Sequence, residues 1–124
     1  MKIVYLSVVG NTRKFVNKFD YDSFELKPNS PIVDINEPFI MILPTYEPEA
    51  VDIAYDFMYA GNNTNFCKGV CGGGNRNFGE KLYGYTARDF SKYFDVPLLM
   101  LFEFTGSIND VNKLKEIVQK IERA

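Results

Sequence analysis

The chain of 124 residues contains no histidine and no tryptophan. The absence of histidine excludes Ser-His-Asp and Cys-His catalysis, histidine-ligated metals and acid–base chemistry by an imidazole. We therefore expect neither a catalytic side chain nor a metal site among its own residues.

The chain also lacks an excess of basic residues and a long apolar run. Its 14 basic and 16 acidic residues give a net charge of −2, which argues against non-specific nucleic-acid binding. No apolar stretch approaches the length of a membrane span, and the first residues do not resemble a signal peptide. We expect one cytoplasmic domain over residues 1–124, with no membrane or nucleic-acid partner.

Cysteine is nearly absent, and the two that occur, Cys67 and Cys71, do not form a CxxC motif. On one strand they would face the same side with their Cα atoms ~13 Å apart. A disulfide requires Cα atoms within about 7 Å, so we expect two buried, reduced thiols.

Apolar residues are plentiful at 46%, and their pattern alternates between strand and helix. Continuously apolar or β-branched segments predict strands at 2–8, 23–27, 39–43, 66–71 and 97–104. Helical spacing predicts helices at 13–19, 49–59 and 78–94, the last with Leu82 facing inward, and a final helix capped by Ser107 and Asp110.

This alternation predicts an α/β fold with a parallel sheet covered on both faces. Five strands fit the flavodoxin-like order 2-1-3-4-5, in which ligands bind beyond the carboxyl ends of the strands. Pro28, Pro31 and Pro38 leave no room for a helix between the second and third strands, so that connection is expected to be extended.

A run of glycines, Gly72 to Gly74, follows the predicted fourth strand and leads to Gly79. It is neither a P-loop nor a dinucleotide fingerprint. Two interpretations remain open: a tight turn from strand to helix, or a backbone that a ligand approaches closely.

Three loops at the predicted carboxyl edge, 7–12, 44–48 and 72–79, should converge on one site. The first surrounds a helix start and suits a phosphate, although Asn11 or Thr12 could equally be an ordinary helix cap. The other two carry Tyr46 and Phe78, which would flank a flat ring. Together the three loops indicate an FMN site.

Several motifs resemble the NrdI family, small flavodoxin-like FMN proteins that serve class Ib ribonucleotide reductase. They are Lys68-Gly69-Val70, Gly73-Gly74-Asn75-Arg76-Asn77-Phe78-Gly79, Val96-Pro97-Leu98-Leu99, Phe102-Glu103-Phe104-Thr105-Gly106 and Asp110-Val111. The resemblance implies a reduced flavin that reacts with O₂ and supplies superoxide or a related oxidant. It also implies two partners: a flavin-reducing protein, and the small subunit of the reductase, whose dimanganese site the oxidant reaches and where a tyrosyl radical forms.

The resemblance assigns the FMN phosphate to loop 7–12 and the isoalloxazine to Thr45, Tyr46 and the glycine loop. The residues expected to contact FMN are Ser7, Val9, Gly10, Asn11, Thr12, Pro44, Thr45, Tyr46, Glu47, Gly72, Gly73, Gly74, Asn75, Asn77, Phe78 and Gly79. Arg76 could contact a partner or brace the glycine loop.

One departure keeps other functions open. Loop 45–48 is shorter than in many family members and has no glycine whose peptide could hydrogen-bond flavin N5. The carboxylates of Glu47, Glu49 and Asp52 would lower the flavin potential, or would merely favour the start of a helix. The alternatives are a general flavodoxin-type electron carrier and a flavin-free binding module.

Overall fold

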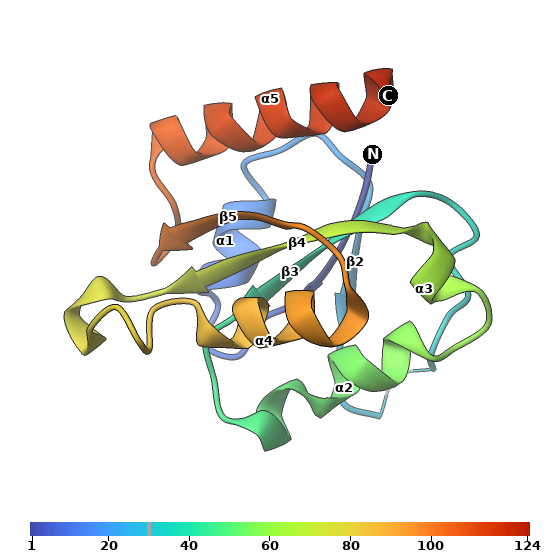
Figure 1. Ribbon diagram of the computed structural model, residues 1–124, viewed down its shortest axis with the longest axis horizontal. Helices are drawn as coiled ribbons and strands as arrows, with labels where there is room; N and C mark the ends of the chain where they lie inside the picture. Colours follow the sequence, from blue (N-terminus) through green and yellow to red (C-terminus); the bar gives the residue numbers. More distant parts are fainter. Residues whose placement is uncertain (30) are drawn as a thin grey trace.

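The computed structural model describes residues 1–29 and 31–124. Five parallel strands form one sheet in the order β2-β1-β3-β4-β5 (Figure 1), which confirms the predicted topology. The strands are β1 (Lys2–Leu6), β2 (Ser23–Leu26), β3 (Phe39–Pro44), β4 (Cys67–Gly74) and β5 (Leu98–Glu103).

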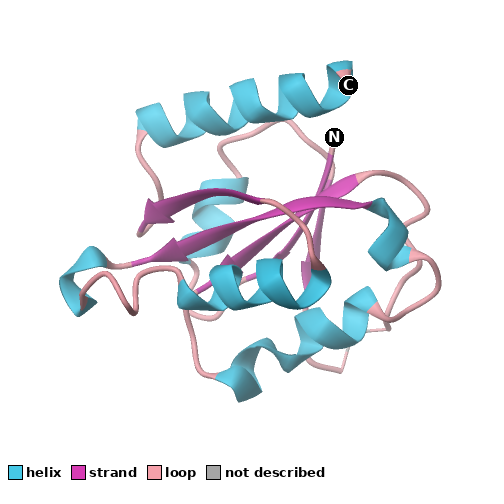
Figure 2. Ribbon diagram, viewed as in Figure 1, coloured by secondary structure: helices cyan, strands magenta, loops and turns pink. Residues whose placement is uncertain are grey.

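Helices cover both faces of the sheet (Figures 1 and 2). One core packs α1 (Asn11–Val16) and α5 (Ile108–Arg123) against the sheet through Phe15 and Leu114. The other packs α2 (Pro48–Met58) and α4 (Tyr85–Phe94) against the opposite face through Phe57 and Phe90. All residues from Phe39 to Leu43 are fully buried, as expected for a central strand that is apolar on both faces.

No helix or strand occurs among the described residues between Leu26 and Phe39, as the prolines predicted. The crossover is held instead by Asn63, at the start of the short helix α3 (Asn63–Phe66). The buried Asn63 amide donates to the carbonyls of Val33 and Phe57, both at 2.9 Å, and its Oδ1 accepts the Ile35 N–H at 2.9 Å. A single side chain thus ties the extended connection to the end of α2.

The glycines of the motif lie inside a strand, so the prediction that the strand ends at Cys71 was wrong. In β4, Gly72 pairs with Leu43 on one side and Leu101 on the other. A Cβ on Gly72 would lie 2.6 Å from the Ala87 Cβ, so packing of α4 against the sheet leaves no space for a side chain. The strand also begins at Cys67, because Phe66 belongs to α3.

The predicted helix at 78–94 was wrong in its first half. Residues Arg76–Phe78 form a short 3₁₀ turn, η1, and α4 begins only at Tyr85, after Gly84 with φ 68°. Leu82, expected to face inward, is 51% exposed. The first strand likewise ends at Leu6, not at residue 8.

Two further predictions are confirmed. Ser107 and Asp110 form a reciprocal capping box at the start of α5. Cys67 and Cys71 are both buried and unpaired. Burial raises the pKa of the Cys67 thiol to about 11 and that of Cys71 to about 12, so both remain protonated and unreactive.

Within the described residues, no helix has the length and apolar character needed to cross a membrane.

Candidate functional site

A cavity of about 320 Å³ opens at the carboxyl edge of the sheet, toward which β3, β4 and β5 all point (Figure 1). It is bounded by the loops after β1, β3 and β4, so the predicted convergence of three loops is confirmed. This is the point where the strand order reverses, the usual ligand position in open α/β sheets. The lining residues are Val8, Val9, Asn11, Thr12, Pro44, Thr45, Tyr46, Gly73, Gly74, Asn75, Phe78, Leu82, Tyr85 and Phe104.

Loop 7–12 leads into α1 through Gly10, whose φ of 96° is strained for other residues. Gly10 occupies the N-cap position, and the Arg13 N–H donates to Ser7 Oγ at 3.3 Å. Neither Asn11 nor Thr12 therefore caps this helix, so that alternative was wrong. Asn11 and the buried Thr12 instead line the cavity.

The loop after β3 is fixed from two sides. Thr45 Oγ1 donates to the Gly73 carbonyl at 2.7 Å, which ties the loop to β4. The Tyr46 N–H donates to Thr86 Oγ1 at 3.0 Å, and the Tyr85 hydroxyl donates to the Tyr46 carbonyl at 2.7 Å. The first turn of α4 thus positions Tyr46 at the wall of the cavity.

The acidic residues after this loop lie outside the cavity. Glu47 is exposed at the N-cap of α2 and Glu49 is exposed in its first turn. Asp52 faces a neighbouring groove between α2 and α4. None of the three lines the cavity, and Glu49 in the first turn of α2 interacts favourably with the helix dipole.

The glycine loop is braced by contacts of its own. Asn75 Oδ1 accepts the Asn77 N–H at 2.9 Å. Glu103 Oε2 accepts the Arg76 backbone N–H at 3.3 Å, and the two side chains approach to 3.7 Å. The Arg76 guanidinium also lies over the Tyr83 ring, 5.2 Å from its centre. Arg76 therefore braces the loop, which is one of the two roles considered for it.

Four lining residues were missed by the sequence analysis: Val8, Leu82, Tyr85 and Phe104. Phe104 follows β5 directly, has a φ of 53°, and donates its N–H to the Gly74 carbonyl at 3.1 Å. The strand predicted at 97–104 included Phe104, whereas β5 ends at Glu103, so its place at the edge of the sheet was not recognised. Leu82 was hidden by the incorrect helix, which placed its side chain in the core.

Ten of the sixteen predicted contact residues line the cavity, and six do not. The six are Ser7, Gly10, Glu47, Gly72, Asn77 and Gly79. Ser7 and Gly10 shape loop 7–12, and Gly72 is buried within β4. The contacts of all sixteen with a ligand remain predictions.

The cavity offers apolar surface, backbone groups and the uncharged polar side chains of asparagine and threonine, but few groups that could catalyse a reaction. None of the described residues that line it is a carboxylate, lysine or arginine, and the phenols of Tyr46 and Tyr85 are its ionisable groups. At its rim, Phe78 is 69% exposed, Val9 67% and Phe104 51%. Large apolar side chains gathered around a hollow indicate a surface that a ligand covers.

The parallel five-stranded sheet, its strand order and the cavity at the point of reversal define a flavodoxin-like protein. Residues 3–116 match the model of the family described as NrdI flavodoxin-like, and the chain belongs to that family.

Similar proteins agree with this assignment. The chain is 31% identical to the protein NrdI of Bartonella henselae, and the match covers 95% of this chain and 92% of that protein. A putative NrdI-like protein of Streptococcus pneumoniae shows the same identity and coverage. The protein NrdI of Mesoplasma florum is 30% identical, with 95% of this chain and 83% of that protein covered.

Solved structures share the fold at low sequence identity. A short-chain flavodoxin associated with a non-canonical PDU bacterial microcompartment superposes with a TM-score of 0.67 at 18% identity, covering 95% of this chain and 93% of its own. Oxidised flavodoxin 2 from Bacillus cereus gives 0.66 at 14% identity, with 99% and 98% covered.

Proposed function

We propose that the chain binds FMN in the cavity at the carboxyl edge of the sheet and activates a class Ib ribonucleotide reductase. One observation carries the proposal: the cavity of an NrdI flavodoxin-like family member is lined by aromatic, aliphatic and uncharged polar side chains and by backbone, without a carboxylate, lysine, arginine or cysteine among the described residues. Such a site is suited to a cofactor that brings its own reactivity.

The residues present fit a flavin. Tyr46 and Phe78 come from different loops and supply aromatic surface for the isoalloxazine. Gly73 and Gly74 present backbone without side chains at the wall of the cavity. The exposed apolar rim would be covered by a ring system of this size, and loop 7–12 would hold the phosphate end.

When bound, FMN supplies electron transfer to O₂. The residues of the chain bind the ring, orient it and limit the access of water. We infer that the superoxide or related oxidant reaches the dimanganese site of the reductase small subunit, where a tyrosyl radical forms. Family membership supports this partner, and a separate flavin-reducing protein would supply the electrons.

The test combines the FMN-loaded, anaerobically reduced protein with the manganese-loaded small subunit and then admits O₂. We expect a tyrosyl radical, detected by electron paramagnetic resonance, in the complete mixture. Free reduced FMN in place of the protein is the control and should yield little radical.

The other outcomes distinguish the alternatives. An FMN-loaded protein that consumes O₂ at the same rate with or without the small subunit, and yields no radical, would indicate a general electron carrier. A protein that takes up no FMN would indicate a flavin-free binding module.

A further inference from the structure

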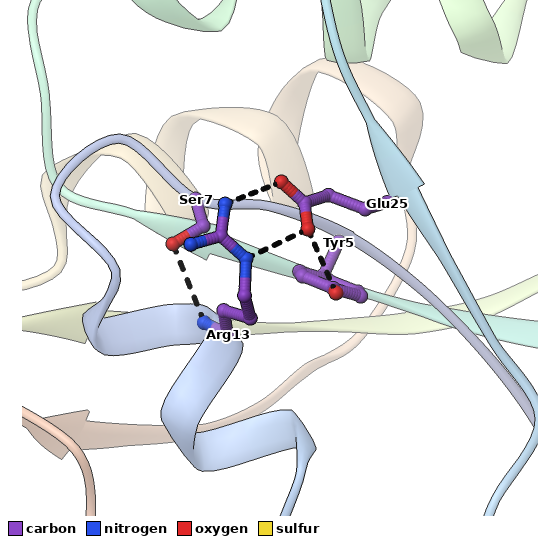
Figure 3. Close-up of polar contacts among 4 residues, drawn as sticks. All are labelled: Tyr5, Ser7, Arg13 and Glu25. Atoms are coloured by element: carbon purple, nitrogen blue, oxygen red, sulfur yellow. Dashed lines mark hydrogen bonds and ion pairs between the residues drawn. The ribbon is translucent and has the colours of Figure 1, made fainter.

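Three side chains from different elements form a compact polar cluster beside loop 7–12 (Figure 3). Arg13 on α1 donates to both carboxylate oxygens of Glu25 on β2, from Nε at 2.9 Å and from Nη2 at 2.7 Å. The Tyr5 hydroxyl on β1 donates to Glu25 Oε1 at 3.0 Å. Two parallel bonds between a guanidinium and a carboxylate fix orientation as well as distance.

The same arginine contacts the loop that leads into its helix. The Arg13 backbone N–H donates to Ser7 Oγ at 3.3 Å (Figure 3). Arg13 therefore binds loop 7–12 through its backbone and β2 through its guanidinium. Its Nη1 lies 4.0 Å from the place where a Cβ on Gly10 would be, which sets the guanidinium against that residue.

Beyond the core contact of Phe15, helix α1 has little of its own to hold its first turn in place. It has only six residues and no side-chain cap, so it makes few internal hydrogen bonds. Glu25 is well placed to provide the support, because its side chain is only 13% exposed and β2 pairs directly with β1. The bidentate pair therefore connects the start of α1 to the rigid sheet.

We propose that Arg13 and Glu25 are positioning residues that hold loop 7–12 in the shape that receives the phosphate of FMN. This inference rests on the proposed FMN site. The pair acts through geometry, because the charge of Arg13 is already neutralised by Glu25 and neither side chain lines the cavity.

If the pair acted only through its charges, Glu25→Gln would change the affinity for FMN in the opposite direction. Replacing Glu25 with glutamine removes a negative charge near a doubly charged phosphate, which by charge alone would tighten FMN binding. If the pair positions the loop, the same change weakens FMN binding, because a neutral amide cannot accept the two charge-assisted hydrogen bonds from Arg13. The direction of the change thus separates the two roles.

The experiment measures the dissociation constants of FMN and riboflavin by fluorescence titration for wild type, Glu25→Gln and Arg13→Lys. Riboflavin has the same ring without the phosphate. We expect FMN affinity to fall about tenfold in both variants, the size expected when a hydrogen bond to a charged group is lost. Riboflavin affinity should change by less than about twofold.

Glu122→Gln is the matched control. Glu122 lies in α5 and pairs with the amino terminus at 3.5 Å. Both ends of the chain lie away from the edge of the sheet toward which β3, β4 and β5 point (Figure 1). Glu122→Gln removes the same charge as Glu25→Gln and should leave the affinities for FMN and riboflavin unchanged. Arg13→Lys keeps the charge and loses the fork, so normal FMN binding in this variant would overturn the proposal.

Other outcomes are equally decisive. Unchanged or tighter FMN binding in Glu25→Gln overturns the proposal, as does an equal loss for FMN and riboflavin. If the wild-type protein binds riboflavin as tightly as FMN, this inference alone is overturned. If it binds neither flavin, the proposed function is overturned as well.

Amide hydrogen exchange of the flavin-free protein provides a readout independent of binding. We expect faster exchange at residues 10–16 in Glu25→Gln than in Glu122→Gln, because α1 loses its tie to β2. Equal exchange in the two variants would show that the pair does not hold the loop.

Discussion

At the scale of single residues, the glycine run shows what a sequence can and cannot reveal. Its position after a predicted strand left a tight turn and a ligand site as alternatives, and Gly73 and Gly74 line the cavity. Its place inside β4 was not evident. Ala87 and Leu101, which leave no space for a side chain at Gly72, come from other elements. Only the packed fold brings these atoms together.

Gly72→Ala should therefore destabilise the protein. The new methyl group would lie 2.6 Å from the Ala87 Cβ and 2.9 Å from Leu101 Cδ2, and α4 would have to move. We expect the free energy of unfolding, measured with urea, to fall by about 1–3 kcal/mol.

Adding Ala87→Gly should restore part of this loss, since it removes the obstructing Cβ. The effects of the two substitutions would then be non-additive. Strict additivity would contradict the packing explanation of Gly72.

Glu25 gives the protein a defined response to acid. Hydrogen bonding by Arg13 holds the pKa of the Glu25 carboxyl below its ordinary value, with smaller contributions from Tyr5 and Lys27. A carboxylate whose pKa is lowered by folding stabilises the protein above its unfolded pKa. That stability is lost as pH falls through the folded pKa.

Glu25→Gln should reduce this dependence on pH. Urea unfolding from about pH 7 down to about pH 3 should show a shallower loss of stability in the variant than in wild type. Identical slopes for the two proteins would mean that the ion pair contributes nothing to folding.

At the scale of elements, the strands and their order were predictable and several boundaries were not. Apolar runs such as Phe39–Leu43 predict buried strands, and the alternation of strands with helices predicts a parallel sheet. The start of α4 was misjudged because Gly84 and the brace of Arg76 over Tyr83 keep residues 79–84 out of the helix. Such tertiary contacts override helical spacing.

The crossover between β2 and β3 depends on an element that the sequence analysis overlooked. The absence of a helix there was predicted from three prolines, but Asn63, which anchors the connection, was not singled out from the sequence. Asn63→Ala removes three hydrogen bonds of 2.9 Å at a fully buried site. We expect a loss of about 2–4 kcal/mol in the free energy of unfolding, since buried backbone groups lose their partners.

The neighbouring Asn65→Ala is a suitable control for this experiment. Asn65 lies in the same short helix and is exposed. Its replacement should change stability by less than about 0.5 kcal/mol. Equal effects of the two substitutions would show that Asn63 is not the anchor of the crossover.

At the scale of the whole molecule, the site is a product of topology. Parallel strands bring loops 7–12, 44–48 and 72–79 to one edge, and this convergence was predictable because it follows from strand order. The full lining was not, since Val8, Leu82 and Phe104 were expected inside regular elements and Tyr85 begins α4. The sequence thus indicates the position of a site better than its walls.

The central claim, that this cavity binds FMN, is tested most directly by visible absorption spectroscopy of the purified protein before and after adding FMN. We predict flavin bands that remain after gel filtration, with a spectrum shifted from that of free FMN by the apolar, aromatic walls. Free FMN should be recovered when the protein is unfolded in urea. A protein that stays colourless after incubation with excess FMN and gel filtration would contradict the account.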